Sequence, residues 1–355
     1  MDSEKIIKFI ESSFLQELLV DENITDISYN GSSIYYLHNL EGRKLSKIQV
    51  SQGDAKDFVR QVANITEKQF SYQSPIIDVT AGKYRLNAVH NSIGRYKETQ
   101  SITFSLRIAS TKPRITDRNS FLTKELISLL KAIIESKISI VIGGITGSGK
   151  TEFQKYLLTK MEPATRLVVI DNVLELSQVE ANEDLDMNIW QADDKNISLS
   201  IQTLVKNALR SNPDWLIIAE SRGGEMLEIL NSVMTGHPII TTIHAQSIDN
   251  MPNRIARMVM MNDKRSDYQE VIQDVYDNFP IHIYLKRTID KRKHVYRFID
   301  SIAFFDKKGK VHKIYERKEN GHIYRSIPKS SLSLFEGIED DVFISTFGGG
   351  KNETL

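Results

Sequence analysis

The chain of 355 residues contains no cysteine and only eight prolines. The lack of cysteine excludes disulfide bonds and thiolate zinc sites, and it is compatible with a reducing compartment. Charge of one sign is not in excess, because 46 Lys and Arg balance 46 Asp and Glu, which argues against a chain built mainly to coat nucleic acid. The sequence also lacks an apolar run long enough to span a membrane and a signal peptide's apolar core. We therefore expect a cytoplasmic protein whose membrane contact, if there is one, is peripheral on the inner face of the membrane.

What the sequence does contain is a phosphate-loop pattern. The stretch from Ile138 to Thr151 reads ISIVIGGITGSGKT, and its end fits G-x-x-x-x-G-K-[ST] at every fixed position. The glycines let successive backbone N–H groups face one anion, the lysine reaches the phosphates, and the threonine hydroxyl can ligate Mg²⁺. The alternative is a glycine-rich strand–helix turn, but an apolar strand before and an amphipathic helix after favour nucleotide binding. The residues expected to hold the nucleotide here are Gly144, Thr146, Gly147, Ser148, Gly149, Lys150 and Thr151, the last also a metal ligand.

Two periodicity patterns divide the chain. Residues 1–109 read as an α+β domain, residues 110–118 as a polar linker that contains Pro113, and residues 119–355 as an α/β domain. The first domain is predicted to contain helices at Ile6–Leu19 and Lys56–Thr66 and strands at Ile24–Tyr29, Ser33–Leu37, Lys83–Val89 and Ser101–Ile108.

The second domain alternates apolar strands with helices, which predicts a parallel sheet covered on both faces. Strands are expected at Ile138–Ile142, Leu167–Ile170, Trp215–Ala219 and Ile239–Ile243, with helices at Thr123–Glu135, Lys150–Met161, Leu199–Arg210 and Glu225–Thr235. Residues of about 264–345 read as an antiparallel addition with strands at His282–Leu285, Val295–Asp300 and Ile302–Phe305. The tail from Gly348 is expected to be disordered.

Polar residues follow three of the apolar strands and are the candidates for catalysis. Glu220 and Arg222 follow one strand, Asp171 and Glu175 a second, and His244 a third. At the carboxyl ends of parallel strands a carboxylate can act on Mg²⁺ or orient water beside bound phosphates. The structural alternatives are a solvated strand-end glutamate, loop capping by Asp171, and a structural histidine.

Together these segments resemble the traffic ATPases, the ring-forming RecA-like motors of type IV secretion, type II secretion and type IV pilus systems. Four motifs occur in the same order as in the family, and a fifth segment resembles the start of the family's N-terminal domain. They are the Walker A motif Gly144–Thr151, the Asp box Asp171–Leu176, the Walker B motif Asn212–Gly223 with NPDWLIIAESRG, the His box Thr235–Ala245 with TGHPIITTIHA, and Asp21–Gly31 with DENITDISYNG.

The resemblance implies a RecA-like P-loop NTPase domain preceded by a PAS-like N-terminal domain, assembled as a homohexamer that hydrolyses ATP with Mg²⁺. It implies that Glu220 is the catalytic glutamate and a metal ligand, that His244 senses the nucleotide state, and that Arg85 and Arg107 reach the γ-phosphate. The implied partners are inner-membrane components of a secretion or pilus machine, without direct sequence-specific nucleic-acid binding.

The chain departs from the family pattern at the Asp box, where Asp171-Asn172 replaces the usual Glu-Asp, so Glu175 can take over part of the role. The absence of the four-cysteine zinc element favours the conjugation-type branch, or the tight-adherence pilus branch. Two other functions stay open from sequence: a nucleic-acid translocase or packaging motor, and a nucleotide-gated scaffold that does not hydrolyse ATP.

Overall fold

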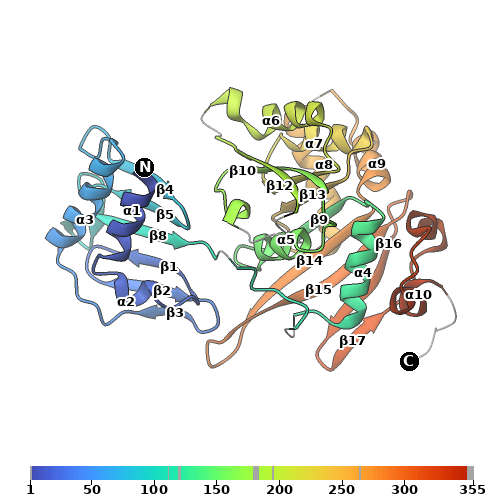
Figure 1. The fold of residues 1–355 in the computed structure, drawn as a ribbon, viewed down its shortest axis with the longest axis horizontal. Helices are drawn as coiled ribbons and strands as arrows, with labels where there is room; N and C mark the ends of the chain where they lie inside the picture. The colour runs from blue at the N-terminus through green and yellow to red at the C-terminus, as the bar shows by residue number, and fades with distance from the viewer. Residues whose placement is uncertain are drawn as a thin grey trace. The chain divides into compact units, whose positions relative to one another are not determined.

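The computed structural model describes residues 2–110, 112–118, 121–178, 184–193, 196–263 and 265–349. The chain forms two compact units, one of Met1–Lys112 with Thr288–Tyr296 and the other of Pro113–Arg287 with Arg297–Leu355 (Figure 1). Thr111 of the predicted linker and residues 350–355 of the predicted disordered tail lie outside the described residues. No described helix is both long and apolar enough to span a membrane.

The smaller unit is a six-stranded antiparallel sheet in the order β3-β2-β1-β8-β5-β4. Its strands alternate buried and exposed residues, as β4 does with the pattern eBeBeB, and helices α1 and α3 pack on the buried face. The elements are α1 (Asp2–Glu11), α2 (Gln16–Leu19), β1 (Ile24–Tyr29), β2 (Ile34–His38), β3 (Gly42–Leu45), α3 (Gln52–Ile65), β4 (Ile76–Ala81), β5 (Tyr84–Val89), the small β6 (Arg95–Tyr96) and β7 (Thr99–Gln100) ribbon, and β8 (Thr103–Ile108).

The single helix predicted over Ile6–Leu19 is wrong, because the chain forms two helices with a break after Glu11. At the break the hydroxyls of Ser12 and Ser13 donate to the carbonyls of Phe9 and Ile10, which offers the backbone an alternative to continuing the helix. Helix α3 begins earlier than predicted, because Ser51 caps it through a reciprocal pair of hydrogen bonds with Asp54.

The larger unit is built on a nine-stranded sheet in the order β11-β10-β12-β13-β9-β14-β15-β16-β17. In this order the strands β11, β10, β12, β13, β9 and β14 are all parallel to one another. The strands are β9 (Ile140–Gly144), β10 (Arg166–Asp171), β11 (Asp186–Gln191), β12 (Trp215–Ser221), β13 (Ile239–Ile243), β14 (Ile281–Ile289), β15 (Val295–Phe305), β16 (Val311–Lys318) and β17 (Gly321–Tyr324). The helices are α4 (Lys124–Glu135), α5 (Lys150–Leu158), α6 (Ile201–Ala208), α7 (Met226–Met234), α8 (Met251–Asn262), α9 (Tyr268–Asn278) and α10 (Asp341–Phe347), with short 3₁₀ turns at Leu176–Gln178, Ile197–Leu199, Leu209–Ser211, Ile248–Asn250 and Lys329–Phe335.

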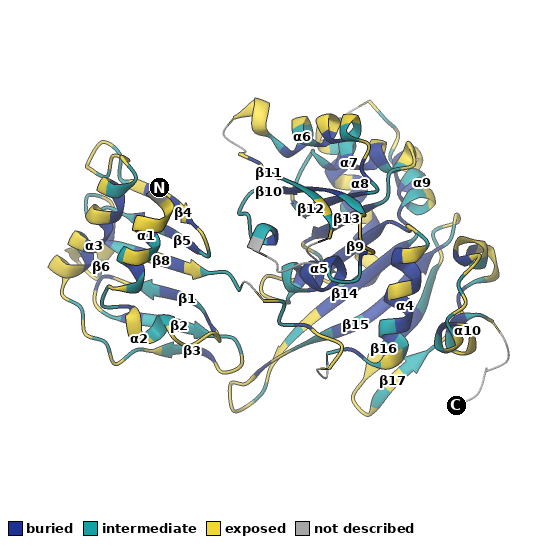
Figure 2. Ribbon diagram, in the orientation of Figure 1, coloured by how far each residue is buried: buried dark blue, intermediate teal, exposed yellow. Residues whose placement is uncertain are grey.

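Alternate residues of the parallel strands feed two separate cores, one on each face of this sheet. Ile140 and Ile142 pack with α4, α5 and the C-terminal segment, whereas Val141 packs with α6 to α9. Figure 1 shows α6 to α9 on one side and α4 with α10 on the other, and Figure 2 shows the strands between them as buried. The predicted parallel sheet covered on both faces is therefore present.

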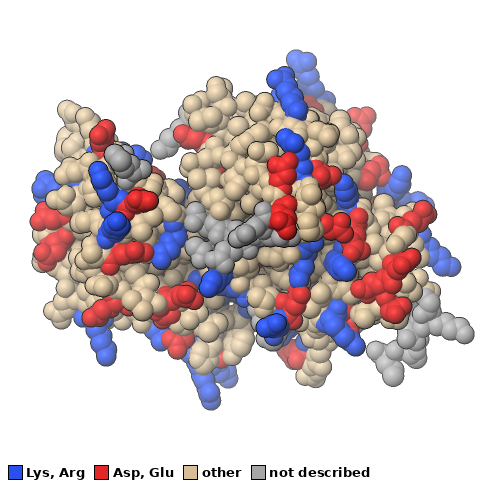
Figure 3. All heavy atoms as spheres, in the orientation of Figure 1, with Lys and Arg blue, Asp and Glu red and all other residues tan. Residues whose placement is uncertain are grey.

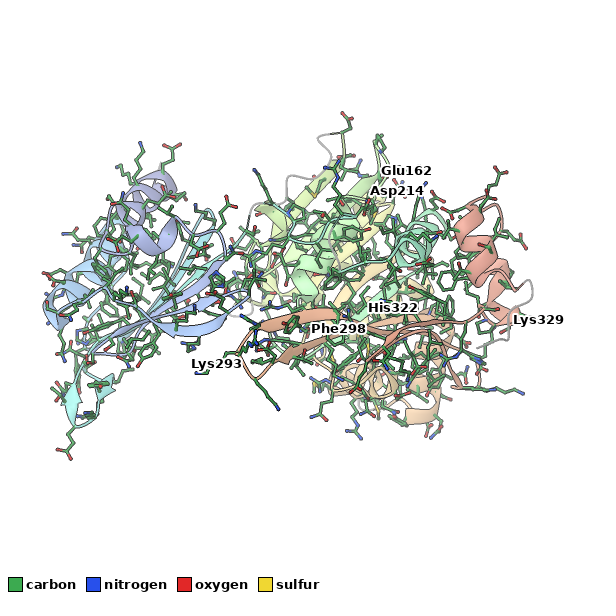
Figure 4. The ribbon with its side chains drawn as sticks, turned by 90° about the horizontal axis from the view of Figure 1, so that it is seen from below. Glu162, Asp214, Lys293, Phe298, His322 and Lys329 are labelled. Atoms are coloured by element: carbon green, nitrogen blue, oxygen red, sulfur yellow. The ribbon has the colours of Figure 1, made fainter. Side chains whose placement is uncertain are left out.

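The prediction for the C-terminal addition is wrong in two respects. Strand β14, expected in the antiparallel part, pairs in parallel with β9, in register Ile281↔Ile140 to Leu285↔Gly144. The two short strands expected between Val295 and Phe305 are one strand, β15. The antiparallel part begins at the short β14–β15 connection, because only antiparallel neighbours can be joined so directly. Phe298 on β15 and His322 on β17, labelled in Figure 4, belong to it.

Candidate nucleotide-binding site

The phosphate loop leaves β9 at the carboxyl edge of the parallel sheet and ends at the first residue of α5. Gly149 caps the helix with φ at 98°, a left-handed conformation that favours glycine. At Gly144 a Cβ would lie 2.4 Å from Ser148 Oγ and 2.6 Å from the Leu285 carbonyl oxygen, so a side chain does not fit there. Strand β14 therefore holds the base of the loop and requires the first glycine of the motif. Asp214, labelled in Figure 4, precedes β12 and marks the opposite edge of the sheet.

Lys150 points into this loop with 8% of its surface exposed. Its Nζ donates to the Gly144 carbonyl at 3.1 Å and lies 3.4 Å from His244 Nδ1. Burial lowers the pKa of Lys150, and the charge of Glu220 opposes that shift. The hydroxyl of Ser148 is buried nearby and has no hydrogen-bond partner among the described residues. A buried ammonium, an unpartnered hydroxyl and a glycine-lined loop fit the phosphate chain of a nucleotide.

Glu220 near the end of β12 lies beside Lys150, as the sequence predicted for a strand-end acid. Its Oε2 accepts a hydrogen bond from Arg222 Nη2 at 2.6 Å, and its Oε1 lies 2.7 Å from His244 Nε2. Burial raises the pKa of Glu220, but the hydrogen bond and charge of Arg222 with the charges of His244 and Lys150 outweigh it, so the pKa lies below its usual value. The buried Oε1 has no aligned hydrogen-bond partner among the described residues. Glu220 is thus held ionised, with one oxygen on Arg222 and the other beside His244.

Three contacts that sequence reasoning missed hold β12 in place. Gln154 Nε2 on α5 donates to the Ile218 carbonyl at 2.9 Å, and Thr242 Oγ1 on β13 donates to the Ala219 carbonyl at 2.8 Å. The hydroxyls of Ser221 and Thr241 lie 2.8 Å apart. No motif marks these contacts, since each forms between elements that are distant in sequence.

Asp171 of the Asp box caps the loop after β10, which is the structural alternative considered for it from sequence. Its Oδ1 accepts from the Val173 N–H at 2.8 Å and its Oδ2 from the Leu176 N–H at 3.0 Å. Both carboxylate oxygens therefore close the turn after β10, and Asp171 is 3% exposed. Glu175 lies half-buried in the same turn.

Arg85 and Arg107 lie in the smaller unit, opposite each other on β5 and β8. Asp26 on β1 is the next partner of Arg107 in the same row. The Nε atoms of Arg85 and Arg107 are 3.8 and 3.6 Å from carboxylate oxygens of Asp78 and Asp26. The two arginines predicted to reach the phosphate are thus neighbours on one sheet, and they belong to the smaller unit.

Two further arginines flank the phosphate loop, and no sequence motif marks either of them. Arg297 at the start of β15 donates from Nε to the Gly147 carbonyl at 2.7 Å. On β14, the Cδ and Nη1 atoms of Arg287 each lie 3.8 Å from the point where a Cβ would stand if Gly147 had a side chain. They reach the loop because β14 lies beside β9 and β15 follows as the next strand.

No group of three His, Asp or Glu side chains suited to a metal ion occurs within the described ranges. Mg²⁺ commonly uses one or two protein groups together with substrate phosphates, so this finding fits a metal held partly by nucleotide. The Thr151 hydroxyl on the first turn of α5 and the Glu220 carboxylate are the oxygen ligands that suit it.

A family model described as "Type II/IV secretion system protein" matches residues 101–284, just over half of the chain. The chain belongs to the type II/IV secretion system protein family. The conjugal transfer protein TrbB of Rhizobium radiobacter is 23% identical over 287 residues, which cover 77% of this chain and 84% of that protein. The type IV secretion system protein VirB11 of Bartonella henselae is 26% identical over 270 residues, covering 66% and 75%. The fold is similar to that of the ATPase DotB of Legionella pneumophila, with a TM-score of 0.64, 20% identity and coverage of 83% and 80%.

Proposed function

We propose that this family member hydrolyses ATP with Mg²⁺ as a homohexameric motor that energises a type IV secretion system of the conjugation type. The observation that carries the proposal is the cluster of Lys150, Glu220, Arg222 and His244 around one phosphate loop. Family membership and the likeness to a conjugal transfer protein and a VirB11 protein support the secretion role. Because ATP is supplied in the cytoplasm, we propose that it works there, with inner-membrane components of the machine as partners.

In this proposal Lys150 and the loop amides bind the phosphates, and Thr151 with Glu220 holds Mg²⁺, which neutralises the charge that develops on the phosphoryl oxygens. The Glu220 carboxylate also orients the attacking water. His244 contacts both Lys150 and Glu220, so it is placed to respond when the phosphates arrive or leave. Since Asp171 is occupied with backbone N–H groups, Glu175 is the Asp-box side chain proposed to help position water.

Substituting Glu220 and Lys150 separates hydrolysis from binding. We expect Glu220→Gln to bind ATP but to lose turnover by roughly 100-fold or more, since removing a water-positioning or charge-stabilising group has effects of that order. Lys150→Ala should abolish tight ATP binding. Turnover by Glu220→Gln at the wild-type rate would overturn the catalytic assignment, and normal ATP binding by Lys150→Ala would overturn the phosphate-loop site. Glu228→Gln on α7, where the half-buried carboxylate pairs with Lys206 and accepts from Gln202, is the matched acid control.

The hexamer is tested by following the ATPase rate per subunit against protein concentration, with light scattering on the same samples. A rate that rises as a six-subunit species forms is expected. A constant rate from a monomer would contradict the ring proposal and leave the hydrolysis proposal intact. Turnover that depends on added DNA would favour the translocase alternative instead.

A further inference from the structure

Arg287 and Arg297 form a basic edge along the outside of the phosphate loop. Both come from the β14–β15 hairpin, and both belong to the larger unit. The Cδ of Arg297 lies 3.5 Å from where a Cβ would stand at Gly149, and Arg287 Nη1 lies 3.8 Å from the equivalent position at Gly147. The two side chains therefore border the glycine stretch whose backbone N–H groups face the phosphates in loops of this type.

Their hydrogen bonding differs. Arg297 is anchored, since its Nε donates to the Gly147 carbonyl. The Nε of Arg287 is buried yet has no hydrogen-bond partner among the described residues. A guanidinium has five donors and cannot be deprotonated under ordinary conditions, so it requires an acceptor or water. Arg287 is thus the member of the pair with donors to spare.

Positive charge gathers at this edge. Burial and the charges of Arg287 and Arg114 together lower the pKa of Arg297 to about 10, and the charge of Glu152 opposes the shift. Glu152 is itself shared, since its carboxylate also accepts from Lys155 Nζ at 3.1 Å and from the Arg114 N–H at 3.1 Å. The carboxylate of Glu152 therefore lies among several cations at the edge of the loop, and the positive charge there would attract a bound phosphate.

We propose that Arg287 binds the phosphate chain of the nucleotide at the outer edge of the loop, and that Arg297 is a positioning residue that fixes the Gly147 peptide for it. The proposal rests on the proposed function, because it assumes that a nucleotide occupies this loop. The edge at Gly147 and Gly149 belongs to the part of the motif that cradles the α- and β-phosphates, whereas Lys150 reaches β and γ. Arg287 therefore contributes to ATP and ADP alike, and it has no contact with the adenine base or the γ-phosphate.

Direct binding of ATP, ADP and inorganic pyrophosphate by calorimetry at fixed salt tests this assignment. Arg287→Gln should weaken all three by roughly tenfold, the order expected for a hydrogen bond between charged groups, while the thermal midpoint stays unchanged. Arg287→Lys keeps the charge and should recover part of the loss. Lys286→Gln is the matched control, because the neighbouring strand residue faces the other way and pairs with Asp300 at 3.5 Å, so its affinities should remain at the wild-type level.

Lys150→Ala in the same series separates this inference from the proposed function. Loss of binding in Lys150→Ala together with wild-type affinities in Arg287→Gln would overturn the Arg287 assignment alone. A loss confined to ATP would also overturn it, because the contact would then be with the γ-phosphate. If Arg287→Gln changed self-association and left nucleotide affinity unchanged, the residue would face a second copy of the chain instead, and the assignment would fall. Normal binding in Lys150→Ala would overturn the site itself.

Discussion

Lys150 shows how single residues in this site depend on close packing. It is almost fully buried, and apart from His244 its hydrogen-bond neighbours in the described structure are carbonyls of its own loop. The loop can bring the ammonium so close because Gly144 leaves room for Ser148 and for the backbone of β14. The lysine and the glycine are therefore required together.

Gly144→Ala tests this dependence. The added Cβ would overlap the Leu285 carbonyl, which is backbone and cannot rotate away, so the loop must shift at a cost of about 1–3 kcal/mol. We expect ATP affinity to fall by roughly tenfold or more, measured by calorimetry. Gly53→Ala is the control, since a Cβ there has only Ser51 Oγ at 3.5 Å. Unchanged affinity in Gly144→Ala would show that the loop adopts another conformation when nucleotide binds.

His282 is a second residue whose burial has a measurable effect, here on the pH dependence of stability. It is fully buried on β14, neither ring nitrogen has a partner among the described residues, and the ring meets Phe305 edge-on at 4.6 Å. Burial lowers its pKa to about 3 from an ordinary value of 6.5. Between these values the unfolded chain binds the extra proton, so His282 contributes stability that is complete above about pH 6.5 and is lost as the pH falls.

We therefore expect the free energy of unfolding to fall between pH 6.5 and pH 4 by up to about 1.4 kcal/mol per pH unit through this residue. His282→Leu should lose that slope, whereas His237→Gln should keep it. Urea unfolding at pH 7, 6 and 5 measures both. An equal slope in wild type and His282→Leu would show that His282 is not held neutral in the folded protein.

At the scale of elements, the C-terminal segment completes the core beneath α4. Phe335, Phe343 and Phe347 belong to the same core as α4 and the parallel strands. Asp340 makes this connection specific, because its Oδ1 accepts from Ser128 on α4 at 2.5 Å and from the Phe343 N–H at the start of α10 at 2.8 Å. The sequence interpretation described this region only as an antiparallel addition.

Asp340→Ala removes both interactions at once. We expect it to lower the free energy of unfolding by about 1–2 kcal/mol, since loss of a helix N-cap alone has an effect of this order. The neighbouring Asp341→Ala is exposed and should cost much less. Denaturant unfolding measures the free energy of unfolding of both variants. Equal losses of stability would contradict the role of Asp340 as the connection between α4 and α10.

The sequence predicted those elements that are marked by local pattern. The phosphate loop, the four apolar strands and the order of the helices around them follow from periodicity and glycine spacing, and the strand-end acid Glu220 was predicted to lie by the loop. The direction of β14, the strands β11, β16 and β17, and the positions of the arginines at 287 and 297 depend on which strands become neighbours. Such pairing joins residues far apart in sequence, so no local pattern could show it.

At the scale of the whole molecule, the chain is neutral, with 46 basic and 46 acidic residues. Figure 3 shows Lys and Arg interspersed with Asp and Glu over the visible surface of each unit, as the neutral composition predicts. On the smaller unit, Arg85 and Arg107 place two positive charges opposite each other on adjacent strands, with Asp26 next in the same row. If they contact the γ-phosphate, they link the smaller unit to the nucleotide state, because only a difference in contact between ATP and ADP can shift a conformational equilibrium.

Arg107→Gln tests that link. We expect ATP affinity to fall by roughly tenfold with ADP affinity unchanged, within the range of ordinary coupling free energies. Arg43→Gln, which loses only a hydrogen bond from Nη1 to Ser28 in the same sheet, is the control. Equal losses of ATP and ADP would indicate a purely structural role for Arg107. This pattern differs from the equal losses expected for Arg287→Gln, so the two arginine sites are separable in one set of titrations.

The smaller unit is not a continuous stretch of chain, because the tip of the β14–β15 hairpin, Thr288–Tyr296, groups with residues 1–112. Within that unit the Val295 N–H donates to the Leu40 carbonyl at 2.7 Å. A fragment that stops at Lys112 would therefore lack part of its own packing. Chimeras that exchange this unit between family members must transplant both segments, and a two-piece graft is the one expected to stay folded.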